Sequence, residues 1–135
     1  MPYTMYTDGG SRGNPGPAGV GVVIINGAGK KVATISKYIG RATNNQAEYQ
    51  ALIKGLEKLQ SLGAREVEIV MDSELIVKQL NQEYKVKNKD LAPLFVRAWN
   101  ILSTLKKYSV RHTVREHNTE ADALVNKALD NASFS

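Results

Sequence analysis

The spacing of apolar residues changes from a strand pattern to a helical pattern partway along the chain, and this change restricts the folds open to it. Before the change, the sequence predicts strands over residues 3–8, 20–25 and about 31–39. A Gly- and Pro-rich loop over 9–19 separates the first two, and an Asn-Gly turn at 26–29 joins the second to the third. Since short turns join antiparallel strands, we expect the chain to begin with an antiparallel meander.

Helical patterns then alternate with short strand patterns. A capping box formed by Thr43 and Gln46 opens the first helix, and Gly63 is expected to end it. The remaining predicted elements are, in order, a strand over 66–71, helices over 73–80 and 91–105, a strand over 108–115 and a helix over 119–132. A strand that follows a helix returns to the sheet by a crossover. We therefore expect one α/β domain over 1–135, with a five-stranded mixed sheet in the chain order βββαβααβα, flanked by helices.

Composition narrows the class of protein. The chain of 135 residues carries a net charge of +5, which suits a polyanionic partner because Lys and Arg displace counterions from phosphates. With no cysteine, disulfides, thiolate metal sites and cysteine nucleophiles are excluded. No apolar run has the length of a membrane span, and no secretory signal is visible at the start. We expect a cytoplasmic protein that does not enter membranes, and its size favours a monomer.

Two acidic residues each end a predicted strand. Asp8 ends the first strand, and Asp72 ends the strand that follows the first helix. Taken singly, Asp8 before two glycines is an ordinary turn residue, and Asp72 is an ordinary helix N-cap. However, sites in α/β sheets gather at the carboxyl ends of strands. The two carboxylates are therefore candidates for one shared site.

Two further acidic residues lie on the apolar faces of predicted helices. Glu48 shares a stripe with Leu52, and Asp122 shares a face with Val125. Asp122 also fits an ordinary capping role in a box begun by Thr119. Glu48 is harder to explain, because a buried charge needs a partner and no Lys or Arg lies on its face. Clustered carboxylates repel one another unless divalent cations offset the repulsion, so the four acids together predict a metal site.

Four motifs, in order along the chain, resemble those of type 1 ribonuclease H. They are YTDGGSRGNPGPAG at 6–19, RATNNQAE at 41–48, MDS at 71–73 and NTEAD at 118–122. The resemblance implies a ribonuclease H-like fold and endonucleolytic cleavage of the RNA strand of RNA–DNA hybrids, as in R-loops and RNA primers. It also implies 5′-phosphate and 3′-hydroxyl products and two Mg²⁺ ions, with Mn²⁺ as a substitute, held by Asp8, Glu48, Asp72 and Asp122.

The same resemblance implies a set of substrate contacts. The residues implied to read the RNA minor groove and its 2′-hydroxyls are Asn14, Asn44 and Asn45. The residues implied to form a pocket for a phosphate of the DNA strand are Arg41, Thr43 and Asn88.

The chain departs from many members of that family in two loops. The segment over 79–89 is too short for the basic, Trp-containing protrusion that many relatives carry, although Lys85 and Lys87 keep some charge there. The loop before the fourth acid is also short, where relatives often have a longer one bearing a catalytic histidine. His117 is the candidate to replace that histidine because its pKa suits proton exchange near neutrality; the alternative is an incidental surface histidine.

Two other functions fit the same fold. One is a non-catalytic module that binds hybrids, which the presence of all four acids disfavours. The other is a related two-metal nuclease that acts on DNA, which the asparagines implied to read 2′-hydroxyls disfavour. Fold alone does not separate these functions, because function depends on the site.

Overall fold

A five-stranded sheet forms the centre of the fold in the computed structural model, which describes residues 2–132. The strand order across the sheet is β3-β2-β1-β4-β5, with β2 antiparallel to β1 and β3, and with β4 parallel to β1 and β5. The strands are β1 (Tyr3–Ser11), β2 (Gly16–Ile25), β3 (Lys31–Ala42), β4 (Glu66–Met71) and β5 (Lys107–His112). The predicted mixed sheet and its chain order are confirmed.

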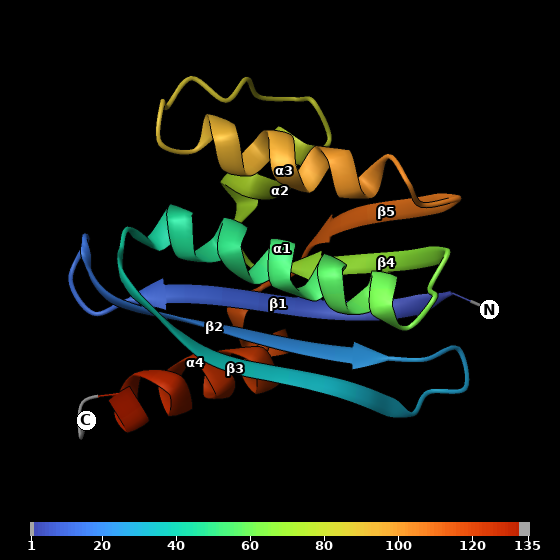
Figure 1. Ribbon diagram of the computed structural model, residues 1–135, viewed down its shortest axis with the longest axis horizontal. Coiled ribbons are helices and arrows are strands. Elements are labelled where there is room, and N and C mark those ends of the chain that lie inside the picture. The colour runs from blue at the N-terminus through green and yellow to red at the C-terminus, as the bar shows by residue number, and fades with distance from the viewer. Residues whose placement is uncertain (1, 133–135) are drawn as a thin grey trace.

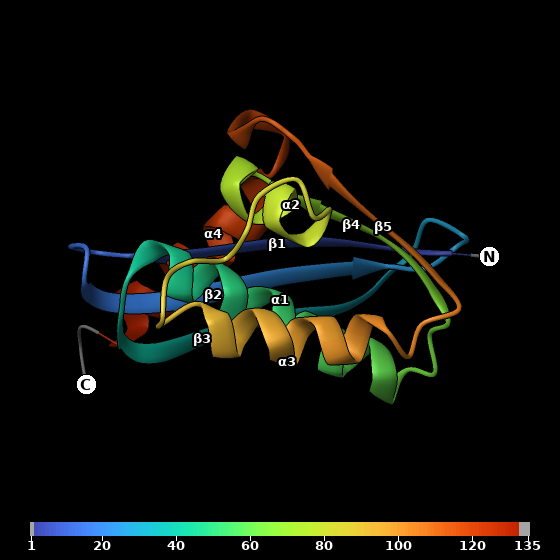
Figure 2. The same ribbon diagram turned by 90° about the horizontal axis from the view of Figure 1, so that it is seen from above.

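Helices cover both faces of this sheet (Figure 1). They are α1 (Asn44–Ser61), α2 (Glu74–Leu80), α3 (Ala92–Leu102) and α4 (Thr119–Ala132), with a short 3₁₀ helix at Arg115–His117. In Figure 1, α1 lies in front of the strands and α4 lies behind β3, and Figure 2 shows α3 running along α1. No helix within residues 2–132 is long and apolar enough to cross a membrane.

Strand glycines let the helices approach the sheet closely. A Cβ atom on Gly9 would overlap the Ala47 carbonyl in the first turn of α1, and one on Gly21 would overlap the Ala121 carbonyl in α4. Successive residues of a strand face opposite sides of the sheet, so odd-numbered Gly9 meets α1, while Gly10 faces Val125 of α4. These contacts bring the starts of α1 and α4 to the end of β1.

The predicted boundaries were wrong in three regions. The segment over 9–19, predicted as a loop, is strand up to Ser11 and again from Gly16, because its glycines accommodate neighbouring helices within the sheet. The last predicted strand, over 108–115, instead ends at His112, and the chain then turns into the 3₁₀ helix that precedes α4. The helix predicted over 91–105 ends at Leu102.

The predicted ends of α1 are confirmed. Thr43 caps it by accepting a hydrogen bond from the Gln46 backbone, and the Gln46 side chain accepts one from the Thr43 backbone. Gly63 follows the helix with φ +72°, a conformation that costs little only in glycine. These caps fix where α1 begins relative to β3, and therefore where its first turn lies above β1.

Candidate active site

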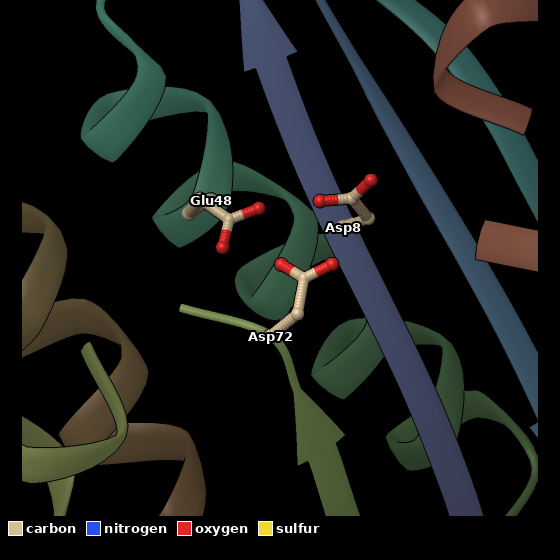
Figure 3. Close-up of side chains that lie close together, drawn as sticks. All are labelled: Asp8, Glu48 and Asp72. Carbon is tan, nitrogen blue, oxygen red and sulfur yellow. The ribbon is translucent and has the colours of Figure 1, made fainter. Parts of the chain in front are cut away.

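Three carboxylates converge where β4 ends beside the middle of β1 (Figure 3). Asp8 comes from β1, Glu48 from the first turns of α1, and Asp72 follows directly after β4. One oxygen from each carboxylate lies within 4.8 Å of the others. The parallel register, in which Thr7 pairs with Met71, explains why Asp8 and Asp72 meet, since the next residue of each strand faces the same side.

Glu48 reaches this cluster from a buried position. Its side chain is 5% exposed, and Oε1 accepts a hydrogen bond from the Gly9 backbone. Its second oxygen, Oε2, is buried and has no hydrogen-bond partner among the described residues. An unsatisfied buried carboxylate oxygen is costly, so the site is completed only when a cation or a donor reaches it.

Burial and mutual repulsion disfavour the charged forms of these acids. The pKa of Asp8 is raised from 3.8 to about 7, first because burial removes its hydration, and further because of the charges on Asp72 and Asp122. Burial is also the main cause of the raised pKa of Glu48, and the neighbouring Asp8 adds to it. A bound divalent cation would reverse both effects by offsetting the negative charge.

The fourth predicted acid, Asp122, lies beside the compact cluster. It lines the same open hollow, of about 540 Å³, but is not one of the three acids with oxygens within 4.8 Å of one another. Its Oδ1 atom is 3.4 Å from an Arg115 nitrogen, and its Oδ2 atom is 3.4 Å from Asn126 Nδ2. The ligand atoms that the four acids offer to a metal are all carboxylate oxygens. Oxygen ligands suit Mg²⁺ or Mn²⁺ rather than a softer metal.

Arg115 lines this hollow, while His117 lies on a neighbouring one of about 270 Å³ bounded by Tyr6 and Glu120. Nearby Asp122 raises the pKa of the Arg115 guanidinium, which places a positive charge beside the acids. Sequence reasoning did not identify Arg115. The sequence did contain a signal for it. Arg115 is the one basic residue between His112 and His117, and it lies a few residues before the predicted site residue Asp122.

Two of the predicted RNA-reading asparagines are fixed by hydrogen bonds within the protein. Asn44 Oδ1 accepts from both the backbone and the hydroxyl of Ser11, at 2.9 and 3.1 Å. Asn14 Oδ1 accepts from the Asn44 backbone at 3.0 Å. These bonds use the amide oxygens, so the NH₂ groups are the atoms able to donate to a ligand. Asn44 and Asn45 both line the acidic hollow, next to Glu48.

Two of the three residues predicted to bind a DNA phosphate share a smaller hollow. Thr43 and Asn88 line this hollow of about 200 Å³ together with Asn14 and Asn45. Asn88 Oδ1 accepts from the Asp90 backbone at 2.7 Å, which again leaves the NH₂ group to donate outward. Arg41 is exposed on β3 and is not among the residues that line the hollow.

The raised pKa values make the stability of the metal-free protein pH-dependent. Because Asp8 holds its proton more tightly folded than unfolded, stability falls as pH rises from about 4 to 7. We expect Asp8→Asn, which carries no charge, to be more stable than the wild type by about 1–3 kcal/mol at pH 8 in EDTA. The difference should shrink at pH 4.5.

Urea unfolding at the two pH values measures this difference. Glu57→Gln, which removes an exposed carboxylate paired with Arg97, serves as the control and should show no such pH-dependent gain. A wild type that is more stable than Asp8→Asn at pH 8 in EDTA would contradict the expected repulsion.

Comparison with known proteins places the chain among nucleases. The family model described as reverse transcriptase-like matches residues 6–128. Ribonuclease HI of Halobacterium salinarum is 48% identical over 94% of this chain and 64% of its own length. A bifunctional protein of Mycobacterium tuberculosis is 46% identical over the whole chain, which spans 37% of that relative. The chain therefore spans less than two thirds of these curated relatives.

A solved structure extends the comparison to three dimensions. LC11-RNase H1 in complex with an RNA/DNA hybrid superposes with a TM-score of 0.91 and is 48% identical, covering 96% of this chain and 98% of that one. This likeness extends over nearly the whole chain.

Proposed function

The chain belongs to the ribonuclease H family, and from that premise we propose that it cleaves the RNA strand of RNA–DNA hybrids. The observation that carries the proposal is the cluster of Asp8, Glu48 and Asp72, in which the buried Oε2 atom of Glu48 has no hydrogen-bond partner among residues 2–132. This cluster opens into a hollow that is also lined by Asn44 and Asn45. The LC11 relative holds a hybrid in its solved complex, which supports the same substrate here.

We propose that two divalent cations, Mg²⁺ or Mn²⁺, occupy the site. Asp8, Glu48 and Asp72 would hold them at the centre, and Asp122 would complete the set from α4. Bound cations of this kind lower the pKa of a water and stabilise charge on a leaving oxygen, so we expect 5′-phosphate and 3′-hydroxyl ends. The carboxylates of Asp8, Glu48 and Asp72 would fix where the cations bind, since one oxygen of each lies within 4.8 Å of the others.

Other residues of the chain would hold the substrate. Glu48, whose Oε2 atom has no hydrogen-bond partner within residues 2–132, would accept a hydrogen bond from a 2′-hydroxyl. The NH₂ groups of Asn14 and Asn44 can donate to acceptors in the minor groove, because their oxygens are engaged within the protein. A strand without 2′-hydroxyls offers no donor to Glu48. This difference provides a physical basis for cutting RNA and sparing DNA.

Cleavage of four matched nucleic acids tests the proposal. The substrates share one sequence and differ in sugar or in the number of strands: an RNA–DNA hybrid, duplex RNA, duplex DNA and single-stranded RNA. With Mg²⁺ or Mn²⁺, we expect cleavage of the hybrid's RNA alone. Binding of the hybrid without cleavage in either metal would instead identify a binding module, and cleavage of duplex DNA would identify a DNA nuclease.

Arg115 is expected to hold a phosphate oxygen of the scissile nucleotide. Its guanidinium lies on the acidic hollow, and its side chain is 77% exposed, so it is free to turn toward a bound phosphate. We expect Arg115→Ala to lower kcat about 100-fold, with KM changed less than about threefold, and Arg115→Lys to restore part of the loss.

Steady-state cleavage of a defined hybrid measures both constants. Arg111→Ala is the matched control, since Arg111 is an exposed arginine that binds Glu68 on the neighbouring strand. Equal kcat values for Arg115→Ala and Arg111→Ala would exclude a role for Arg115 in the reaction.

A further inference from the structure

Asn118 is a buried polar residue just before α4. It is 2% exposed, although it lies in a short loop next to exposed Glu116 and His117. Its Oδ1 atom is buried and has no hydrogen-bond partner among the described residues. Burying an amide in this way is unfavourable unless its other contacts compensate. The contacts of its NH₂ group lie at the acidic cluster.

The Asn118 side chain connects two strands at the point where each presents an acid. Its Nδ2 atom donates to the Thr7 carbonyl at 2.9 Å, directly before Asp8 in β1. The same atom lies 3.4 Å from Asp72 Oδ2, beyond the end of β4. One NH₂ group thus bridges the backbone next to Asp8 and the carboxylate of Asp72. A change in its position would move these two acids relative to each other.

The Asn118 backbone connects the third element of the site. Its carbonyl accepts the hydrogen bond of the Asp122 N–H, at 3.1 Å, which is the first helical bond at the start of α4. Its own N–H donates to the Arg115 carbonyl at 3.0 Å. A single residue therefore contacts Asp72 directly and holds the segments that carry Asp8, Asp122 and Arg115.

We propose that Asn118 is a positioning residue, which holds Asp72 and the start of α4 at the spacing that the proposed cation site requires. The inference rests on the proposed function, because it concerns the same carboxylates. Groups that orient the ligands of a metal, without touching the metal, typically change affinity or activity by about 10–100-fold when removed. Asn118 orients the carboxylate of Asp72, and it also fixes the backbone next to Asp8 and at the start of α4.

Binding of Mn²⁺ alone, followed by the electron paramagnetic resonance of free Mn²⁺, tests this inference without substrate. Two variants are needed. Asn118→Ala removes the amide, and Asn118→Asp keeps its shape but cannot donate to Thr7 or Asp72. We expect both to bind Mn²⁺ about tenfold more weakly than the wild type. The result for Asn118→Asp is the sharper one, because its added negative charge would strengthen cation binding if charge alone mattered.

The matched control is Asn81→Ala. Asn81 Nδ2 donates to the Val110 carbonyl at 3.1 Å, so it joins a helix end to a strand in the same manner, away from the acids. We expect Asn81→Ala to leave Mn²⁺ affinity within twofold of the wild type. Cleavage of the hybrid should separate the variants in the same way. Either Asn118 variant should lower kcat at least tenfold and change KM less than threefold, and Asn81→Ala should change neither constant.

The outcomes separate the two proposals. If the wild type binds no Mn²⁺, the cation site of the proposed function fails. If the wild type binds Mn²⁺ and either Asn118 variant weakens that binding less than threefold, the positioning role of Asn118 is overturned. Weakening by threefold or more in both variants, with Asn81→Ala unchanged, supports it.

Discussion

Replacing Asp8 by Asn is expected to lower the single-turnover rate constant for hybrid cleavage at least about 1000-fold, equivalent to about 4 kcal/mol of transition-state stabilisation. Asp8 supplies one of three oxygens that lie within 4.8 Å of one another, and Asn carries no charge with which to hold a divalent cation. The substitution keeps the size of the side chain, so packing against β4 and α1 is retained. Single-turnover cleavage of a labelled hybrid at saturating Mg²⁺ gives the rate.

Two controls separate chemistry from binding and from folding. Hybrid affinity in EDTA should change less than about threefold, because the asparagines and Arg115 that would contact the substrate remain. Glu57→Gln, which removes an exposed carboxylate on the far part of α1, should keep the wild-type rate. An Asp8→Asn variant that cleaves within tenfold of the wild type would show that the acidic cluster does not hold the catalytic cations.

The second large effect concerns stability. Gly9→Ala is expected to destabilise the fold by about 3 kcal/mol or more, which would lower the melting temperature by roughly 10 °C. The added Cβ would overlap the Ala47 carbonyl and lie 2.6 Å from the Glu48 nitrogen. Both are backbone atoms in the first turn of α1, so no side chain can rotate to relieve the overlap. The whole helix would have to move away from β1.

Gly10→Ala is the matched control, because it adds the same methyl group to the next residue of the same strand. Its Cβ would be 3.7 Å from Val125 Cγ1, an ordinary contact distance, and so the change in unfolding free energy should stay within about 1 kcal/mol. Chemical unfolding in EDTA, which excludes any effect of cations, compares the two. Equal stabilities would mean that α1 does not pack against Gly9 as described.

These glycines also explain where the sequence misled the prediction of the fold. Gly9 and Gly10 carry the signals of a loop, yet they continue β1, since the residue opposite each in β2 stays in register. A local pattern does not reveal that a helix will pack on a strand and require a residue without a side chain. By contrast, the capping box at Thr43 and the stop at Gly63 depend on local backbone geometry, and both were predicted correctly.

Some residues of the site were predicted from the sequence and others were not. Asp8 and Asp72 were both predicted to end strands; β1 in fact continues to Ser11, and the two acids meet because the parallel register pairs Thr7 with Met71. Glu48 stood out as a charge on an apolar stripe. Asn118 was not predicted, since its importance depends on a contact with a residue far away in the sequence. Arg115 was missed although its partner Asp122 lies only 7 residues further along the chain. Asn118 contacts Thr7 across a separation of 111 residues, which no local pattern encodes.

The most direct test of cation-dependent cleavage of the RNA strand uses an RNA–DNA hybrid labelled separately on each strand, with Mg²⁺ and then with EDTA. We expect cuts in the RNA strand only, with 3′-hydroxyl ends that a polymerase can extend, and no cuts once EDTA removes the cations. Cleavage of the DNA strand, or cleavage of RNA that persists in EDTA, would contradict this expectation.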